Sequence, residues 1–504
     1  MTAKAIAVLG TGSDVGKSLI AAGLCRLLRR QGVRVAPFKA QNMSLNSFVT
    51  PEGGEIGRAQ ALQAEACGLP PHVDMNPILL KPEAENRSQI VLRGKVFAKL
   101  DAVNYFDRRT ELWRVVQESY ARLASQHDVV VIEGAGSAAE VNLRNRDLVN
   151  WPVVQMADAK VVLVADIDRG GVFAQVVGTL DLLEPNERER ICGIVINKFR
   201  GDRRLFDDGV RFLKSKTGLP VLGVVPFLRD LALDQEDSLD LSRNQRIAFG
   251  SDRVNVAVIL LPHMSNFTDF NVLVAEADVA LRYVSVPSEC NQADVIIIPG
   301  SKNTMADLAY LHEKGFTQVC EDHVSNQKEL IGICGGYQML GQTVADPYEV
   351  EESGSTSGLG FLEIETELQR EKYTTQVDAV ALGQPQWGST TVKGYQIHMG
   401  VTRRFGGQPC FKIQGPIEAA VNGGFDGAMT IDGLVWGSYI HGLFDAPGFR
   451  RHWLNNARAR KGLRPLDQRV SSEVTACVGA ELDRWADHLA CYLHVEAIKP
   501  RTLS

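Results

Sequence analysis

The stretch AIAVLGTGSDVGKSLIAAGLCRLL (residues 5–28) decides which fold the first half of the chain is expected to adopt. It begins with an apolar run typical of a buried strand, continues through a glycine-rich turn, and ends with apolar residues at helical spacing. The turn closes on Gly16, Lys17 and Ser18, at the expected start of the helix. This order predicts a strand, a loop and a helix, which together form the first unit of a parallel α/β sheet.

The glycine-rich turn has the composition of a phosphate-binding loop. Small residues let backbone N–H groups surround phosphate oxygens, a lysine adds a positive charge, and a hydroxyl group can ligate magnesium. We therefore expect an ATP site with Mg²⁺ as its cofactor, formed by Gly10, Thr11, Gly12, Gly16, Lys17 and Ser18. Thr11 stands where the usual motif has its first glycine, and a plain glycine turn is the alternative interpretation.

The loop GTGSDVGKS (residues 10–18) resembles that of dethiobiotin synthetase and its relatives, and the resemblance implies further site residues. Lys39 matches the lysine that those enzymes place near the transferred phosphate. Glu133 ends an apolar strand and is the expected second magnesium ligand beside Ser18, although such a carboxylate is often only a helix cap. Asn197 resembles an asparagine that reads adenine, but an asparagine that ends a strand in a turn is equally expected.

A second motif, KELIGICGGYQMLGQ (residues 328–342), passes from an apolar strand through two glycines into a helix, with Cys334 at the turn. A strained turn of this kind exposes a nucleophile, and the helix N-terminus that follows favours the thiolate. Adjacent N–H groups can stabilise an oxyanion. The context predicts acyl transfer at Cys334, whereas a cysteine in other surroundings is usually inert core packing.

The catalytic base is expected to be a histidine at another strand end. His441, in LVWGSYIHGLFD, fits best, and His398 is the rival candidate. Cys334 with His441 resembles the dyad of class I glutamine amidotransferases, which implies that glutamine is bound and its ammonia released. In that family a glutamate usually follows the histidine by two residues, but here the position is Leu443. The sequence therefore leaves open which residue orients His441.

Backbone N–H groups near two glycines are expected to form the oxyanion hole of this second site. Gly300, in IIIPGSKNT, falls where such domains place their oxyanion strand. Gly335 directly follows the nucleophile and supplies the second N–H group. Because the sequence PGS is also a common turn, a purely structural role is the alternative for Gly300.

Near-continuous apolar runs recur in two series and predict an α/β chain with two doubly wound domains. Residues 1–230 are expected to form a P-loop NTPase-like parallel sheet, the ATP-binding synthetase domain. An acidic linker over residues 231–250 leads to a class I glutamine amidotransferase-like sheet over residues 251–448, followed by a helical extension over residues 449–504. Residues 342–392 are irregular and predict an insertion or an edge hairpin.

The whole chain resembles the cobyric acid synthase family, whose motifs occur in the same order over residues 1–448. QNMSLNS (residues 41–47) and MNPILLKP (residues 75–82) are not explained by nucleotide binding. The resemblance implies a glutamine-dependent amidoligase of cobalamin biosynthesis that amidates the b, d, e and g carboxylates of adenosylcobyrinic acid a,c-diamide. The residues by themselves indicate only an ATP-dependent, glutamine-fed ligase acting on a carboxylate. Cobyrinic acid a,c-diamide synthase and a non-catalytic P-loop ATP switch are the alternatives.

Charge and composition exclude other classes of protein. Lys and Arg number 54 against 60 Asp and Glu, so the net charge of −6 provides no general field for nucleic acid. The apolar runs fall short of the about 20 residues that cross a bilayer. Nine scattered cysteines without a Cys-x-x-Cys pair, and an N-terminus without a signal sequence, predict reduced thiols and a cytoplasmic protein. A corrinoid polycarboxylate must then meet a local basic patch around the first site. The oligomeric state, monomer or homo-oligomer, is left open.

Overall fold

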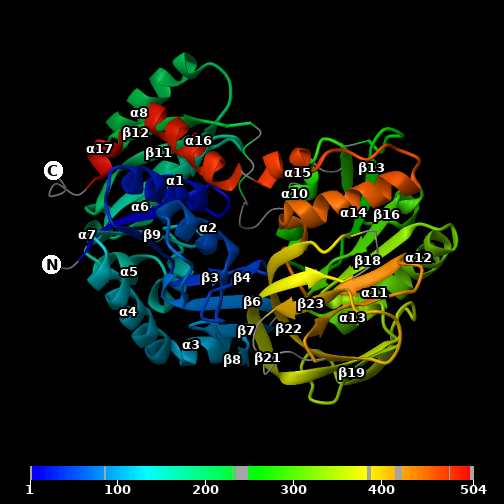
Figure 1. Ribbon diagram of the computed structural model, residues 1–504. Coiled ribbons are helices and arrows are strands. Elements are labelled where there is room, and N and C mark those ends of the chain that lie inside the picture. The colour runs from blue at the N-terminus through cyan, green and yellow to red at the C-terminus, as the bar shows by residue number, and fades with distance from the viewer. Residues whose placement is uncertain are drawn as a thin grey trace. The chain divides into compact units, whose positions relative to one another are not determined.

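The computed structural model describes residues 3–84, 87–229, 231, 233, 248–382, 387–414, 423–475 and 477–499. The chain forms two compact units, each with a central parallel sheet (Figure 1). Unit 1 comprises Met1–Ser44, Gly54–Asp237 and Val478–Ser504, and unit 2 comprises Leu45–Gly53 and Ser238–Cys477. The predicted class, α/β with two doubly wound domains, is confirmed.

Unit 1 is built around a six-stranded sheet in the order β12-β11-β10-β1-β9-β2, in which all neighbours are parallel. β1 (Lys4–Gly10) lies inside the sheet, and its residues after Lys4 are buried. Such a strand has to be apolar throughout because both of its faces are covered. The other strands are β2 (Val35–Phe38), β9 (Val129–Glu133), β10 (Lys160–Asp166), β11 (Ile191–Phe199) and β12 (Val221–Pro226).

Helices cover both faces of this sheet and form two apolar cores. Alternate residues of β1 belong to different cores, since Ile6 and Val8 lie in one and Ala7 and Leu9 in the other. The core of Ile6 and Val8 includes α1 (Lys17–Arg30), α2 (Arg58–Cys67) and α16 (Cys477–Tyr492). The opposite core includes α4 (Arg109–Gln126), α5 (Trp151–Met156), α6 (Val172–Leu182) and α8 (Asp207–Thr217).

Helix α16, near the C-terminus, packs against α1, although the two are far apart in the sequence (Figure 1). Trp485 Nε1 donates a hydrogen bond to Leu19 O at 2.6 Å. A Cβ on Gly23 would lie 2.2 Å from Leu489 Cδ1, so the glycine permits this close approach. α16 is therefore part of the core that supports the phosphate-loop helix.

The part of the sequence that connects β2 to β9 contains a smaller sheet of unit 1. Its order is β3-β6-β7-β8, and the short helix α3 (Ala102–Asp107) follows it. The strands are β3 (Gln41–Met43), β6 (Ile78–Ala84), β7 (Arg87–Leu92) and β8 (Lys95–Leu100).

Unit 2 has a second six-stranded sheet, in the order β15-β13-β16-β18-β26-β25. Five of its strands are parallel, and the edge strand β25 (Ala428–Met429) is antiparallel. The parallel strands are β13 (Val254–Ile259), β15 (Val279–Val284), β16 (Val295–Ile298), β18 (Glu329–Ile333) and β26 (Val435–Ser438). Helices α11 (Thr304–Lys314), α12 (Phe316–Ser325) and α14 (Pro447–Arg460) contribute to its core.

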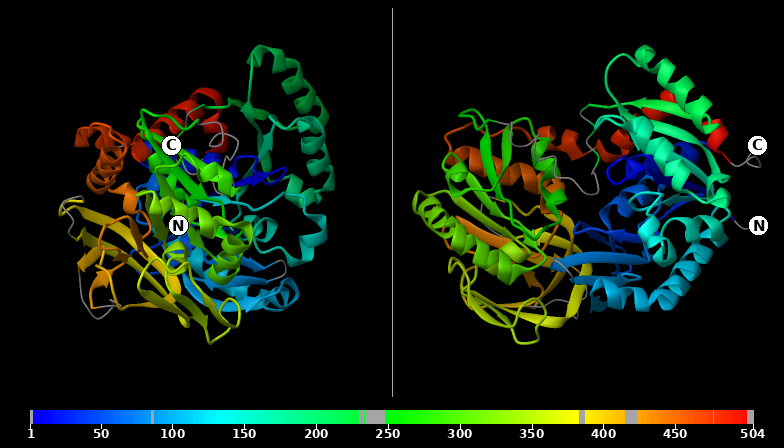
Figure 2. Two further views of the ribbon diagram at one scale, coloured as in Figure 1. Left: turned by 90° about the vertical axis from the view of Figure 1, so that its right-hand side faces the viewer. Right: turned by 180° about the vertical axis from the view of Figure 1, so that it is seen from behind.

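The irregular stretch 342–392 contains the first half of a long hairpin rather than an edge element. β21 (Ile364–Ala381) pairs with β22 (Thr391–Arg404), and the two are drawn in yellow in Figure 2. β21 also pairs with β19 (Thr343–Asp346) and β23 (Phe411–Gln414), so it lies inside a second sheet. Polar residues on the exposed side of β21 interrupt its apolar pattern, so the strand was not recognised from the sequence.

Two segments lie in a unit other than the one that their place in the sequence suggests. Leu45–Gly53, within the predicted domain 1–230, belongs to unit 2, and Val478–Ser504, within the predicted extension 449–504, belongs to unit 1. In both cases side-chain packing, and not chain order, decides the unit. Most of the predicted acidic linker 231–250, namely residues 232 and 234–247, lies outside the described residues.

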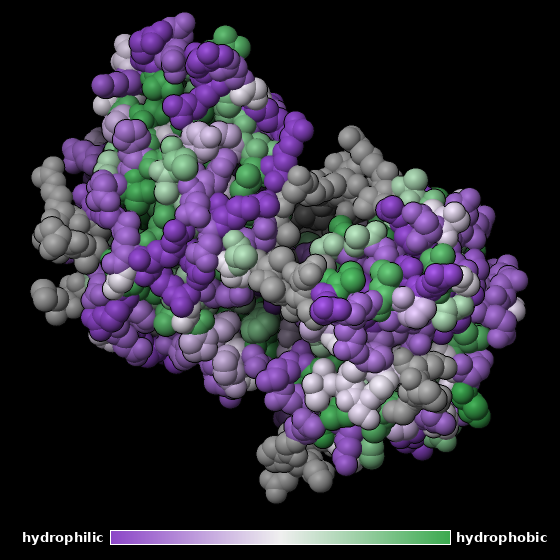
Figure 3. All heavy atoms as spheres, turned by 45° about the horizontal axis from the view of Figure 1, so that its top comes forward, coloured by the Kyte–Doolittle hydropathy of each residue, from purple (hydrophilic) through white to green (hydrophobic). Residues whose placement is uncertain are grey.

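The structure also bears on membrane association and thiol chemistry. No helix in the described part of the chain is long and apolar enough to span a membrane. The face seen in Figure 3 is mostly hydrophilic, with small apolar patches. Eight cysteines among the described residues are free thiols.

Candidate functional site

The phosphate loop of unit 1 joins β1 to α1 through a glycine that no other residue could replace without strain. Gly16 has φ 95°, in the left-handed region, and a Cβ there would lie 2.2 Å from Asn197 Nδ2. At Gly10 a Cβ would lie 2.6 Å from Val15 Cγ2. The tight turn brings the loop backbone directly to the N-terminus of α1, where N–H groups are free of helical partners.

The Lys17 side chain connects the phosphate loop with the segment that follows β9. The side chain is 8% exposed, and its Nζ donates hydrogen bonds to Gly12 O at 2.8 Å and Gly136 O at 2.9 Å. Thr11 lies at the rim of the loop, where its hydroxyl donates to Gln175 Oε1 at 3.4 Å. The ammonium group is thus centred between the loop and the segment after β9.

The buried carboxylate of Glu133 contacts the end of this loop. Glu133, at the end of β9, is 1% exposed, and Oε1 accepts hydrogen bonds from Ser18 Oγ at 2.7 Å and Lys39 Nζ at 3.0 Å. Oε2 accepts from Gln63 Nε2 at 2.5 Å and from Gln60 Nε2 at 3.4 Å. The structure therefore brings together Ser18, Lys39 and Glu133, which the sequence identified, and adds two glutamines of α2 that the sequence analysis missed.

These residues fit a magnesium ion bound together with a nucleotide. Mg²⁺ in nucleotide sites takes one or two protein oxygens, and phosphates and water supply the rest. The Ser18 hydroxyl and the Glu133 carboxylate provide such a pair. Gln63 Oε1 is a buried acceptor that has no hydrogen-bond partner among the described residues. Those residues contain no cluster of three or more His, Cys, Asp or Glu for a metal, so a site held by protein ligands alone is not indicated.

Asn197 lies beside the loop at the end of β11. Its Nδ2 donates to Val15 O at 2.9 Å, and Lys198 Nζ donates to Asp14 O at 2.5 Å. Lys198 also forms a salt bridge of 3.1 Å with Asp166, at the end of β10. Both side chains therefore brace the loop on the β10 side of β1.

In unit 2, Cys334 lies at the sharp turn between β18 and α13 (Gly335–Met339). Its backbone has φ 52° and ψ −106°, a strained conformation for a residue with a side chain. The N–H group donates to Ser438 O at 2.8 Å, which ties the turn to the neighbouring strand β26. The residue is 6% exposed, and its Sγ lies 3.5 Å from Ile397 O of β22.

His441 follows β26, the strand that pairs with β18, so the fold places it beside Cys334. The imidazole Nδ1 lies 2.7 Å from Asp269 Oδ2. The second oxygen of that carboxylate, Oδ1, accepts from Gly442 N at 3.1 Å. Asp269 therefore orients His441 with both of its oxygens, and the arrangement has the form of a nucleophile, a base and an orienting acid.

The charge of the imidazole depends on its two partners. Burial lowers the pKa of His441, but the Asp269 carboxylate and then Cys334 raise it more, to about 10. The imidazole is therefore protonated at neutral pH and faces the sulfur atom. A proton held in this position can be delivered to a leaving amine.

Asp269, the partner of His441, was not identified from the sequence. It belongs to the short turn η4 (Phe267–Phe270), and is separated from His441 by 172 residues. The expected position, two residues after the histidine, is Leu443, which is 1% exposed and part of the apolar core. No spacing in the sequence relates Asp269 to His441.

The two glycines proposed for the oxyanion hole adjoin this triad. A Cβ on Gly300, in β17 (Gly300–Ser301), would lie 3.3 Å from His441 Cε1. A Cβ on Gly335, the first residue of α13, would lie 2.8 Å from Ser301 N. Backbone of both segments thus reaches the space next to the thiol.

The rival histidine, His398, has a different environment. It lies on β22, where its Nδ1 donates to Gly400 O at 2.7 Å and its ring stacks on Tyr439 at 3.7 Å between centroids. Burial lowers its pKa to about 3, so the ring is neutral. The carboxylate expected beside a catalytic base is found at His441.

Two family models match the chain, one for each type of domain that was expected. Residues 6–240 match the CobQ/CobB/MinD/ParA nucleotide binding domain, and residues 255–449 match the CobB/CobQ-like glutamine amidotransferase domain. A cobyric acid synthase of Syntrophobacter fumaroxidans is 45% identical over 99% of this chain and 98% of its own. One of Klebsiella pneumoniae (strain 342) is 47% identical over 98% of this chain and 97% of its own.

Solved structures add little. PurLQS from Thermotoga maritima covers 44% of this chain and 98% of its own, with 14% identity and a TM-score of 0.31, which is too slight to bear on fold or function. The full-length relatives, together with the two matched domains, confirm the predicted enzyme class. The chain belongs to the cobyric acid synthase family of glutamine-dependent amidoligases.

Proposed function

We propose that this enzyme converts adenosylcobyrinic acid a,c-diamide to cobyric acid by amidating its b, d, e and g carboxylates, with one ATP and one glutamine consumed for each amide. The observation that carries the proposal is that one chain contains both a phosphate-loop arrangement and a Cys-His-Asp arrangement. Unit 2 supplies the Cys334–His441–Asp269 arrangement, and unit 1 supplies a phosphate loop with a buried Lys39–Glu133 pair. The identity of the substrate rests on the named relatives and on the long shared motifs.

In unit 2 the reaction would begin when the Cys334 thiolate attacks the carboxamide carbon of glutamine. The N–H groups near Gly300 and Gly335 would stabilise the oxyanion, and His441 would give its proton to the leaving nitrogen, so that ammonia departs and a thioester forms. Water activated by His441 then hydrolyses the thioester to glutamate and regenerates the thiol. Asp269 keeps the imidazole in place through both steps.

In unit 1 a substrate carboxylate would attack the terminal phosphate of ATP and give an acyl phosphate and ADP. Lys17 and Lys39 would neutralise charge on the phosphate oxygens, and Asn197 would meet the adenine. Magnesium, held by Ser18 and Glu133, would supply further charge neutralisation on those oxygens. Ammonia then attacks the acyl carbon, inorganic phosphate leaves, and a proton is lost from the nitrogen to give the amide.

Replacement of the nucleophile separates the two half-reactions. Cys334→Ala should abolish synthesis from glutamine but retain synthesis from added ammonia, because only the nitrogen source is lost. Lys17→Ala should impair synthesis with both donors, because phosphate binding is lost. Amides on the corrinoid are counted by mass spectrometry, and equal loss with both donors in Cys334→Ala would refute the two-site scheme.

The same assay decides between the two corrinoid amidations. Cobyrinic acid itself, offered in place of its a,c-diamide, should remain unamidated at positions a and c. Rapid formation of an a,c-diamide would instead identify a cobyrinic acid a,c-diamide synthase, and no amidation of any corrinoid would favour an ATP switch. We place the reaction in the cytoplasm, which the free thiols of the described cysteines support.

A further inference from the structure

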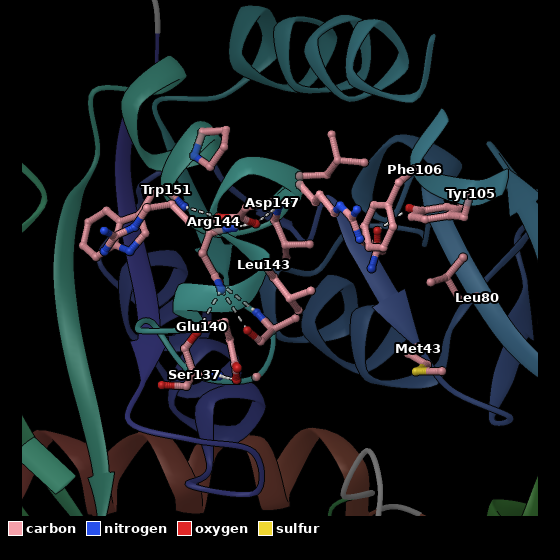
Figure 4. Close-up of a pocket in the computed structure, with 18 of the residues that line it drawn as sticks. Met43, Leu80, Tyr105, Phe106, Ser137, Glu140, Leu143, Arg144, Asp147 and Trp151 are labelled. Atoms are coloured by element: carbon pink, nitrogen blue, oxygen red, sulfur yellow. Dashed lines mark hydrogen bonds between the residues drawn. The ribbon is translucent and has the colours of Figure 1, made fainter. Parts of the chain in front are cut away.

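Unit 1 contains a pocket of 670 Å³ beside the phosphate loop (Figure 4). Its walls come from the four-stranded sheet, from α3 and from the segment that follows β9. Gly136 lines the pocket, and its carbonyl oxygen accepts the hydrogen bond from Lys17 Nζ. The cavity therefore lies directly beside the lysine that is proposed to hold the phosphates.

The order of the strands shows which end of the nucleotide this pocket would meet. β1 has β10 and then β11 on one side, and β9 on the other. Asn197, the proposed adenine contact, ends β11, whereas Glu133 and Gly136 lie at and after the end of β9. With its base toward Asn197, the nucleotide points its terminal phosphate toward β9. The pocket is thus on the side where the phosphate acceptor must bind.

The pocket walls are largely apolar. Met43, Leu80 and Phe106 lie on one side of the cavity and Leu143 on the other (Figure 4). Met43 and Leu143 are 55% and 39% exposed, so both present apolar surface to whatever enters. A concave, mainly apolar site with a few polar groups is the usual form of a small-molecule site. Two opposed apolar walls suit a flat ring with apolar faces.

One arginine gives this pocket an available positive charge. The guanidinium carbon of Arg146 lies 4.9 Å from the centre of the Phe106 ring, at a distance typical of cation–π contacts. Among the described residues no carboxylate forms an ion pair with Arg146. Arg144, in contrast, is neutralised by Glu184 at 2.6 Å and Glu187 at 3.3 Å. Arg146 is therefore the cation that can receive a carboxylate from a ligand.

The acidic residues around the pocket are engaged with the backbone. Each accepts a hydrogen bond from the N–H group of a nearby turn or helix start. The pairs are Asp101 with Asn104 N at 2.9 Å, Glu140 with Ser137 N at 3.1 Å, Asp147 with Val149 N at 2.7 Å, and Glu187 with Glu184 N at 2.9 Å.

We propose that this pocket holds the corrin ring of the substrate, with a face of the ring against Met43 and Phe106 and one peripheral carboxylate on Arg146. The proposal rests on the corrinoid amidation proposed above and deepens it by locating the acceptor. The ring is held by apolar walls, while the reacting carboxylate extends past Gly136 to the terminal phosphate.

The first test places a negative charge on an exposed apolar wall. Leu143→Glu should weaken binding of adenosylcobyrinic acid a,c-diamide about tenfold or more, because the carboxylate loses its hydration against the ring face and repels the anionic rim. Leu205→Glu is the matched control, since Leu205 is 84% exposed in unit 1 and does not line the pocket. Binding is measured by equilibrium dialysis, with the visible absorbance of the corrinoid as the signal. Affinity for ATP should stay within twofold of wild type in both variants.

The second test addresses the charge on Arg146. Arg146→Gln should weaken binding of the polycarboxylate several-fold while changing the binding of cobyric acid, whose b, d, e and g carboxylates are amides, much less, and Arg146→Lys should restore part of the difference. Equal binding by wild type, Leu143→Glu and Leu205→Glu, in a wild type that amidates the corrinoid, would overturn the pocket assignment alone. A wild type that neither binds nor amidates any corrinoid acid would overturn the proposed function itself.

Discussion

Replacement of Asp269 by asparagine tests whether this residue, which the sequence did not predict, orients His441. The carboxylate accepts two hydrogen bonds at once, from His441 Nδ1 at 2.7 Å and from Gly442 N at 3.1 Å. An asparagine side chain has one acceptor oxygen and one NH₂ group, so it can satisfy only one of these donors. When its NH₂ group faces the imidazole, Nδ1 has to be unprotonated, and the proton moves to the wrong nitrogen for general-base catalysis.

The structure also sets the size of the expected loss. The pKa of His441 rises from 6.5 to about 10 despite burial, and Asp269 is the largest contributor to the rise. A difference of that size corresponds to about 5 kcal/mol between the two protonation states. Loss of the Asp269 carboxylate therefore predicts a fall in glutaminase kcat of about 10²-fold, and an incorrect tautomer extends it toward about 10⁴-fold.

The assay measures glutamine hydrolysis and corrinoid amidation in parallel. Asp269→Asn should lose hydrolysis and glutamine-dependent amidation together, while amidation from added ammonia continues at the wild-type rate. Asp322→Asn is the matched control, because this exposed carboxylate of α12 contacts only Gln318 at 3.1 Å among the hydrogen bonds of its side chain. Glutaminase activity of Asp269→Asn within threefold of wild type would refute the assignment of Asp269 as the residue that orients His441.

Three further substitutions test other parts of the structure. Gly16→Ala should abolish nucleotide binding, measured by calorimetry, but leave glutamine hydrolysis intact, because its Cβ would collide with Asn197 Nδ2; wild-type affinity would contradict the loop geometry. Trp485→Ala should destabilise unit 1 by about 3–5 kcal/mol, seen as a lower thermal midpoint, and an unchanged midpoint would show that α16 adds nothing to the core. His323→Gln should reduce the acid sensitivity of unit 2, although the buried His398 contributes as well. Burial lowers the pKa of His323 to about 4, so the unfolded chain takes up a proton near pH 6.5 that the folded unit cannot, and about 3 kcal/mol of stability is lost between pH 6.5 and 4. Identical pH profiles of unfolding for wild type and variant would contradict this.

The parts of the fold that could be predicted are those that local physics determines. A buried parallel strand must be apolar throughout, and the phosphate loop needs its glycine at Gly16, so both leave a local signature. Cys334 and His441 were also predictable, because each ends an apolar strand and parallel strands bring such ends to one edge.

Other contacts could not be predicted, because they depend on how distant segments pack. Gln60 and Gln63 look like solvent-facing residues of α2, yet both donate to the buried Glu133. Asp269 belongs to a turn whose position relative to His441 is set by the order of four strands, β13, β16, β18 and β26. In the proposed triad, a carboxylate on another segment takes the place of the glutamate usually found after the histidine, so the histidine–carboxylate contact is present although the local motif is absent.

The segment Leu45–Gly53 shows why the limits of the glutaminase unit do not follow from chain order. Ser47 N donates to Oδ1 of Asn266, at 3.0 Å, and Asn266 precedes Asp269 by three residues. Ser47 O accepts a hydrogen bond from the hydroxyl of Tyr395 at 3.1 Å. Tyr395 in turn stacks on the ring of His441, with centroids 5.3 Å apart. Residues that flank both the base and its orienting acid are thus held by a segment from the N-terminal part of the chain. A glutaminase cut out as residues 251–448 would lack these contacts, and the geometry of the triad depends on the chain as a whole.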